Sequence, residues 1–374
     1  MNKGIEDILT RGVVEVIDKE HLETRLKGGK TLRIKLGIDP TSPNIHIGRA
    51  VLLRKLRDFQ DLGHTAVFIV GDTTGVVGDS SDKEAERPML TEEEVVSNMK
   101  SYFDQAFKIL DPDKTETHYN SEWLSKLGFL ELASMANLFS VHEFTSREVI
   151  AKRIKAGQRV SFHEMLYPLM QGYDSVAVKA DVELGGTDQR FNLLTGRKVQ
   201  EFYKQEPQDI LMTDLLEGLD GRKMSSSWGN VINVTDEAND MYGKVMSLKD
   251  DLVERYFELV TRVPMSEVLE IMKLHPKEGK MRLAYEITKM YHDEESAKSA
   301  EDNFEKTFSK GSVPDDIKTV SVDKGTPLDK ILIDAGLVSS KTEFNRLMKA
   351  GAIEEKEDGV YRIGKHRFIK INIS

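Results

Sequence analysis

Two short segments combine glycine, cationic side chains and hydroxyls in a way that suits a polyphosphate. HIGR (residues 46–49) follows a turn-forming stretch and precedes an apolar-periodic one, so it marks the start of an expected helix. The free N–H groups of that helix end favour an anion, Gly48 leaves the backbone open to a flat ring or a phosphate, and His46 and Arg49 add donors. GRKMSSS (residues 221–227) offers a lysine and three hydroxyls on a glycine-flanked loop, as a clamp on the same phosphates would. Taken singly, the first also fits a helix cap and the second a common surface loop.

A third set of polar residues lies along one stripe of a predicted helix. His163, Tyr167, Gln171 and Asp174 are spaced so that they share one helix face. Such a stripe is most often solvated, but its neighbours here are largely apolar, which favours burial. Asp174 can accept a hydrogen bond from a phenol or an amine, and Gln171 and Tyr167 can orient an amino group. We therefore expect a site for a polar small molecule.

Further candidates stand where predicted strands end. Asp79 follows a buried strand, and Lys83 and Arg87 occupy the polar loop behind it, although an ordinary exit from strand to loop explains this segment equally well. Asp188 and Gln189 follow a pair of glycines, where a ribose or a carboxylate would fit. The chain has no Walker loop, zinc-ligand spacing or nucleophile elbow. We expect a nucleotide site without a P-loop, and no metal bound by the protein itself.

Hydrophobic periodicity predicts two halves of a parallel sheet that would position these residues. Residues 31–39 alternate as a strand does, an amphipathic helix follows, and residues 65–72 form the continuous apolar run of a buried strand, which together make a βαβ unit. The pattern returns with a predicted strand at 175–184, a helix from Asp188 and a short strand at 209–216. The fold class is therefore α/β, with a Rossmann-like parallel sheet. Ligands bind such sheets at the carboxyl ends of the strands, where both loop motifs would meet.

The remaining sequence suggests three further parts. We expect a Rossmann-like catalytic domain over residues 1–233, with a helical insertion at about 92–166, and a helical domain at 234–310. A linker rich in glycine, proline and charge is expected at 311–326, and a small α+β module at 327–374.

Composition excludes several classes of protein. The 374 residues carry a formal charge of -10 and contain no cysteine. They also lack the run of about 20 apolar residues that a membrane helix needs, so no membrane partner is expected. Disulfides, thiolate catalysis and cysteine-based zinc sites are excluded, and a cytoplasmic location is expected. The acidic charge argues against a protein that coats DNA or RNA indiscriminately, but it permits a local basic surface.

HIGR and KMSSS resemble the His-Ile-Gly-His and Lys-Met-Ser-Lys-Ser signatures of class I aminoacyl-tRNA synthetases. Together with LGIDPTSPNIHIGR, YNSEWL, HEMLYPLMQGYDSVAVKADVELGGTDQRFNLL and DGRKMSSS, they make residues 32–234 similar to bacterial tyrosyl-tRNA synthetases. The segment PLDKILIDAGLVSSKTEFNRLMKAGAIE resembles the small RNA-binding module that ends these enzymes, in which two short helices precede strands.

The resemblance implies a reaction and its participants. ATP, with Mg²⁺ on the nucleotide, would activate tyrosine to tyrosyl-adenylate and pyrophosphate, and the tyrosine would then pass to the 3′ end of tRNA(Tyr). A homodimer is implied because the family is dimeric.

The resemblance also implies a role for each matching residue. His46 would bind charge on the phosphates, Gly48 would lie under the adenine, Asp188 would hold the ribose and Lys223 the pyrophosphate. Other expected ATP or catalytic contacts are Asp39, Arg49, Gly186, Met224, Ser226 and the mobile cationic pair Lys83 and Arg87. The expected tyrosine contacts are Gly37, Asp79, Tyr167, Gln171, Asp174 and Gln189, with Asp174 reading the phenol.

Three positions depart from the family pattern. Arg49 replaces the second histidine of the first signature, and Ser226 replaces the second lysine of the other. Because Ser226 removes a charge near the phosphates, we expect activity to depend more strongly on Mg²⁺ or another cation. Lys35 stands where one branch of the family places a tyrosine against the phenol. Two other interpretations remain: a tryptophanyl enzyme, which shares both signatures, and a catalytically silent paralogue that binds RNA.

Overall fold

The computed structural model divides into two compact units. The structure describes residues 3–81, 89–309, 317–322, 325–338, 340–349, 351–355, 359–364 and 367–373. Unit 1 comprises Met1–Asp236 and Leu248–Gly279, and unit 2 comprises Glu237–Ser247 and Lys280–Ser374. No helix in these described ranges is long and apolar enough to cross a membrane.

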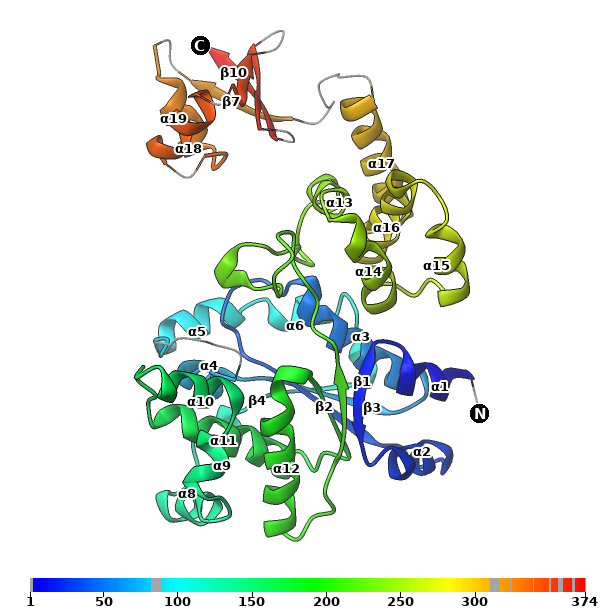
Figure 1. The fold of residues 1–374 in the computed structure, drawn as a ribbon, viewed down its shortest axis with the longest axis vertical. Coiled ribbons are helices and arrows are strands. Elements are labelled where there is room, and N and C mark those ends of the chain that lie inside the picture. Colours follow the sequence, from blue (N-terminus) through cyan, green and yellow to red (C-terminus); the bar gives the residue numbers. More distant parts are fainter. Residues whose placement is uncertain are drawn as a thin grey trace. The chain divides into compact units, whose positions relative to one another are not determined.

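A six-stranded sheet forms the centre of unit 1, in the order β1-β6-β5-β2-β3-β4 (Figure 1). Five strands are parallel and β1 pairs antiparallel with β6 at one edge. The chain runs outward from β2 to β4 on one side and from β5 to β6 on the other, so the strand order reverses between β2 and β5. A ligand crevice is expected at this reversal. The strands are β1 (Val13–Ile17), β2 (Arg33–Ile38), β3 (Thr65–Val70), β4 (Thr115–Tyr119), β5 (Val182–Gly186) and β6 (Asp209–Thr213).

Helices cover the sheet, and the α/β, parallel-sheet prediction is confirmed (Figure 1). The strands β5 and β6 are buried along their whole length, as is expected when both faces of a parallel sheet are covered. The helices of unit 1 are α1 (Lys3–Thr10), α2 (Lys19–Lys27), α3 (Ile47–Asp61), α4 (Asp72–Val77), α5 (Glu92–Met99), α6 (Tyr102–Ala106), α7 (Ser121–Leu124), α8 (Phe129–Ala136), α9 (Val141–Thr145), α10 (Glu148–Lys155), α11 (His163–Ala177), α12 (Arg190–Phe202), α14 (Val253–Val260) and α15 (Met265–Ile271).

Three details differ from the sequence-based expectations. The predicted strand at 175–184 is wrong in its first part, because α11 continues to Ala177 and β5 begins only at Val182. The helix ends before Lys179, whose φ of 50° no longer continues a right-handed helix. The expected helical region at 92–166 also contains β4, and the edge strand β1 was not predicted.

Unit 2 combines helices with a small second sheet. The helices are α13 (Ala238–Met246), most of α16 (Pro276–Tyr291), α17 (Glu294–Ser309), α18 (Leu328–Asp334) and α19 (Lys341–Lys349). The sheet has the order β7-β10-β9-β8, from β7 (Lys318–Val322), β8 (Ile353–Glu355), β9 (Val360–Ile363) and β10 (Arg367–Ile373). Its buried core consists of Ile331, Leu332, Val338, Ile363, Ile369 and Ile371. The strand β7 falls within the segment expected to be a linker, where it pairs in parallel with β10.

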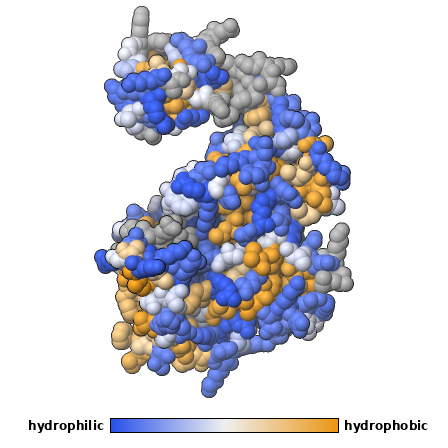
Figure 2. Space-filling model, viewed as in Figure 1, coloured by the Kyte–Doolittle hydropathy of each residue, from blue (hydrophilic) through white to orange (hydrophobic). Residues whose placement is uncertain are grey.

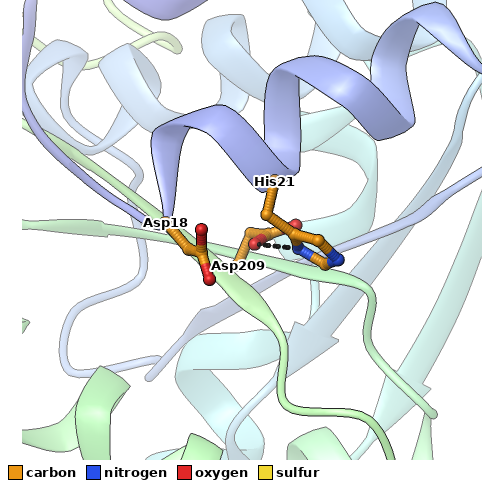
Figure 3. Close-up of side chains that lie close together, drawn as sticks. All are labelled: Asp18, His21 and Asp209. Carbon is orange, nitrogen blue, oxygen red and sulfur yellow. Dashed lines mark hydrogen bonds and ion pairs between the residues drawn. The ribbon is translucent and has the colours of Figure 1, made fainter.

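A buried carboxylate ties α2 to the first residue of β6. Asp209 is fully buried, and its carboxylate lies 2.8 Å from His21 Nδ1 (Figure 3). This hydrogen bond raises the pKa of His21. The carboxylate also lies 3.2 Å from the Arg25 guanidinium. Asp18 lies close enough that one ligand-type atom from each of Asp18, His21 and Asp209 falls within 4.8 Å of the others. Because β6 is parallel to β5 and β2, this cluster lies at the amino end of the sheet, away from the crevice.

Candidate active site

A cleft at the carboxyl ends of β2 and β5 gathers most of the residues that the sequence singled out, but His163, the first residue of the predicted stripe and of α11, does not line it. Its volume is about 230 Å³. Every described residue expected at the ATP or tyrosine lines it, namely Gly37, Asp39, His46, Gly48, Arg49, Asp79, Tyr167, Gln171, Asp174, Gly186, Asp188, Gln189, Lys223, Met224 and Ser226. Lys83 and Arg87 lie outside the described residues.

His46 caps the amino end of α3 as a neutral imidazole. Its Nδ1 accepts the backbone N–H of Arg49 at 3.3 Å, so Nε2 carries the ring proton. Burial lowers the pKa of His46 to about 3, and the nearby charges of Arg49 and Lys223 act in the same direction. The ring is therefore a neutral N–H donor across the whole physiological range.

The two signature segments contact one another. The Gly48 N–H lies 3.3 Å from the sulfur of Met224, and a Cβ at Gly48 would lie 3.0 Å from His46 Nδ1. The hydroxyls of Ser42 and Ser226 are 3.1 Å apart. Since the second signature lies directly over the first, one ligand can contact both.

Lys223 and Asp188 form an ion pair in the cleft, with 2.7 Å between Nζ and Oδ2. Gly186 is needed beside it, because a Cβ there would lie 2.5 Å from Asp188 Oδ1 and 2.8 Å from Leu215. A nucleotide that uses Asp188 for its ribose and Lys223 for its phosphates would separate this pair.

The Arg49 guanidinium holds the turn before α3. It donates to the backbone oxygen of Asp39 at 3.1 Å, to Tyr102 Oη at 3.0 Å and to Thr41 Oγ1 at 2.7 Å. The expected cation of the first signature is thus present, and it fixes the loop that leads into the helix.

Asp174 lies in a buried pocket at the side of the cleft. Trp123 Nε1 donates to its Oδ1 at 2.7 Å, and Asn120 Nδ2 donates to its Oδ2 at 3.3 Å. Burial raises the pKa of Asp174 to about 7, although Lys35 and both hydrogen bonds favour the charged form. A carboxylate accepts about four hydrogen bonds, so Asp174 retains acceptor capacity for a ligand O–H or N–H.

Polar groups of several elements surround the rest of the ligand space. The hydroxyls of Tyr167 and Thr74 donate to the two carboxylate oxygens of Asp39 at 2.8 and 2.7 Å, so Asp39 links β2 to α11 and α4. Gln189 Nε2 donates to Asp79 Oδ2 at 2.6 Å. Asp39, which was expected to contact ATP, is therefore hydrogen-bonded to Tyr167, which was expected to contact tyrosine.

Sequence reasoning assigned no role to four residues that shape this pocket. Asn120 and Trp123 come from the segment YNSEWL, and Lys35 and Glu183 form a buried ion pair beneath the cleft with 2.8 Å between Nζ and Oε1. The available signal was a charged residue in each of two predicted strands of a parallel sheet, because such a sheet is covered on both faces and a buried charge requires a partner.

The fold and the paired signatures define a class I aminoacyl-tRNA synthetase, and comparison with known proteins agrees. Residues 27–309 match the family described as tRNA synthetases class I (W and Y). The chain belongs to this family, and the resemblance noted in the sequence is confirmed.

The most informative relatives are tyrosine enzymes. The chain is 45% identical to the tyrosine–tRNA ligase of Thermotoga maritima, over 98% of this chain and 96% of that one. It is 46% identical to the tyrosine–tRNA ligase of Idiomarina loihiensis, over 98% and 97%. The tyrosyl-tRNA synthetase of Archaeoglobus fulgidus, solved with L-tyrosine, has a TM-score of 0.64 at 24% identity, over 80% of this chain and 99% of that chain. This last likeness shows the fold alone.

Proposed function

We propose that the protein is a tyrosine–tRNA ligase, which activates tyrosine with ATP and transfers it to tRNA(Tyr). The observation that carries the proposal is the joining of both signature segments over one cleft with a buried carboxylate at its side. The relatives named tyrosine–tRNA ligase, which match nearly the full chain, support the same amino acid.

The amino acid occupies the α11 side of the cleft. The phenol O–H donates to Asp174, whose carboxylate Trp123 and Asn120 hold in place. Tyr167, Gln171 and Asp79 bind the α-amino group, and Gln189 orients the carboxylate. Gly37 lies beside this space, where a Cβ would have no neighbour within 4 Å and the ring has room.

ATP occupies the side formed by the two signatures. Its adenine lies on Gly48 beside Met224, Asp188 and Gly186 hold the ribose, and His46 and Lys223 contact the phosphates. The nucleotide enters as its magnesium complex, which supplies charge that the serine at position 226 does not. Asp39, Arg49 and Ser226 hold the loops that form this half, and Lys83 and Arg87 complete the set of expected cations.

The chemistry requires position and charge stabilisation and no protein nucleophile. A carboxylate oxygen of tyrosine attacks the α-phosphorus, the bond to the β-phosphate oxygen breaks, and pyrophosphate leaves with that electron pair. A hydroxyl of the terminal tRNA ribose then attacks the activated carbonyl, the bond from the carbonyl carbon to the phosphate oxygen breaks, and AMP leaves with that electron pair while the hydroxyl proton passes to the AMP phosphate or to water. Because the nucleophile is already ionised, the contributions of His46 and Lys223 are orientation and stabilisation of charge at phosphorus.

Other parts of the chain take the remaining roles. The helical domain and the C-terminal module, expected at residues 234–310 and 327–374, bind the tRNA, and the protein works in the cytoplasm as a homodimer. An exposed apolar face supports the dimer, since α8 and its neighbours carry large hydrophobic side chains in solvent (Figure 2). These are Phe129, Leu130, Val141 and Phe162, each 77% or more exposed.

The test is amino-acid-dependent exchange of pyrophosphate into ATP by the purified protein. Exchange with tyrosine, and much less with tryptophan or phenylalanine, is the expected result. Exchange that depends on tryptophan and not on tyrosine would identify tryptophan as the substrate. No exchange with any of the three would overturn the enzyme proposal in favour of an RNA-binding paralogue.

A further inference from the structure

Beneath the cleft lies a buried ion pair that contacts Gln171 at one end of the ligand space and acts through charge on Asp174 at the other. We propose that Lys35 and Glu183 are positioning residues for tyrosine, which orient the amide of Gln171 and set the electrostatic surroundings of Asp174. This inference rests on the proposed function and extends it to residues that the family signatures do not include.

Lys35 is a fully buried cation with a complete set of partners. Its Nζ lies 2.8 Å from Glu183 Oε1, 2.7 Å from Ser175 Oγ and 2.8 Å from the backbone oxygen of Gln171. These three acceptors use the three donors of the ammonium group. The side chain of Lys35 therefore joins β2 to β5 and to α11, the helix that carries Gln171 and Asp174.

Glu183 determines which end of the Gln171 amide faces the cleft. Its carboxylate accepts from Gln171 Nε2 at 3.0 Å and from Ser175 Oγ at 3.2 Å, and also from Gln208 Nε2. An ionised carboxylate only accepts hydrogen bonds, so the amide nitrogen of Gln171 must point toward it. The amide oxygen is then left for the cleft, where it can accept from the ammonium group of an amino acid.

The same pair acts on the opposite end of the ligand through charge. Asp174 faces Lys35 of β2, which favours its ionised form, and Glu183 of β5, which opposes it. From its other neighbours it receives two neutral donors, Asn120 and Trp123, and it also faces the hydroxyl of Tyr167 on its own helix. Lys35 is the strongest of the influences that favour the carboxylate, which is the form that accepts a phenol O–H.

A purely structural role makes a different prediction. Buried ion pairs are often replaced by apolar residues of similar volume without loss of stability. If Lys35 and Glu183 only fill the core, such a replacement leaves the affinity for tyrosine and its pH dependence unchanged.

The decisive experiment compares two variants by pyrophosphate exchange between pH 5.5 and 9. The variant Lys35→Met/Glu183→Leu removes both charges and the partner of Gln171. We expect the KM for tyrosine to rise about tenfold at pH 7, the KM for ATP to stay within twofold, and the acid limb of kcat/KM for tyrosine to move to higher pH by about one unit. The variant Glu183→Gln keeps one acceptor oxygen for Lys35 and Gln171, loses the oxygen that accepts from Ser175 and Gln208, and removes the opposing charge, so its acid limb moves to lower pH.

The opposite signs make the test independent of a general loss of stability. Asp209→Asn, a buried isosteric change at the amino end of the same sheet, is the matched control and leaves the limb in place. Limbs that do not move, or that move the same way in both variants, would overturn the proposal. If Glu183→Gln, which leaves Lys35 without its counter-ion, does not fold, Lys35→Met/Glu183→Leu decides alone, and a limb that stays in place in that variant overturns the proposal. Failure of the parent protein to exchange with tyrosine would instead count against the proposed function.

Discussion

Asp174→Asn is the substitution with the most specific expected effect on amino acid selection. The side chain keeps its size and loses its charge and one acceptor atom. If its remaining oxygen stays toward Trp123, its new NH₂ group meets the NH₂ group of Asn120, and the phenol has only a neutral oxygen, shared with Trp123, as its acceptor. If the amide turns round, the buried indole N–H of Trp123 loses its partner. Either arrangement removes at least one hydrogen bond to a charged group.

The size of the effect follows from that loss. A hydrogen bond to a charged group contributes about 1.5–3 kcal/mol, so kcat/KM for tyrosine should fall about 10- to 150-fold. Phenylalanine does not use the acceptor, so its kcat/KM should stay level or rise. A site that hydrogen-bonds the substrate hydroxyl rejects the analogue by roughly 10⁵-fold, and this ratio should fall with the tyrosine value.

The pH dependence gives a second readout with a defined sign. The pKa of Asp174 is raised to about 7, so in the parent protein kcat/KM for tyrosine should decline as the pH falls through 7 and the carboxylate protonates. The asparagine variant should show no such decline. Because burial disfavours the charged form, removing the charge should not lower the melting temperature above pH 7.

Steady-state exchange with tyrosine and with phenylalanine, followed across pH, measures the selectivity and the pH dependence. Thermal melts measure the stability. Asp209→Asn again serves as the isosteric control away from the cleft. Equal losses of kcat/KM for tyrosine and phenylalanine would refute the assignment of Asp174 as the hydrogen-bond acceptor of the phenol. An unchanged acid limb of the pH profile would refute it too.

Two further substitutions test the phosphate side and the exposed face. His46→Ala should lower kcat for exchange by about 10²–10³-fold, as removal of one transition-state donor does, with little change in the KM for tyrosine. Since the pKa of His46 is about 3, its contribution should be constant from pH 5 to 9; a loss that disappears below pH 6.5 would contradict a neutral donor. Phe129→Asp/Leu130→Asp should convert a dimer into monomers by light scattering, because both side chains are more than 80% exposed in one chain; a dimer that persists would place the interface elsewhere.

The position of the cleft was predictable because it follows from strand direction alone. Strands at 31–39 and 65–72 were recognisable from alternation and from a continuous apolar run, and parallel strands bring their carboxyl ends to one edge. Once those strands were placed, His46 and Asp188 had to lie near the same crevice, and all the described residues expected at the ATP or tyrosine do line it, although His163 of the predicted stripe does not.

The errors have equally local causes. The run SVAVKADVEL is apolar enough for either a helix or a strand, and it contains no glycine or proline to mark the boundary at Lys179. Alternation over residues 31–39 places Lys35 among the polar positions of its strand, so it does not reveal that this charge is buried, and its partner Glu183 lies on another strand far along the chain. The roles of Asn120 and Trp123 depend on tertiary contacts with Asp174 that no local pattern encodes.

The buried pair of Lys35 and Glu183 also limits how this lineage can diverge. Removing one member of a buried ion pair costs about 3–5 kcal/mol, a large share of the stability of a typical domain, whereas replacing both is often tolerated. Single substitutions at either position are thus expected to be purged, and a neutral residue should become established only when its counterpart changes too. Among the many relatives of this chain, positions 35 and 183 should therefore covary, so that a relative lacking the lysine also lacks the glutamate.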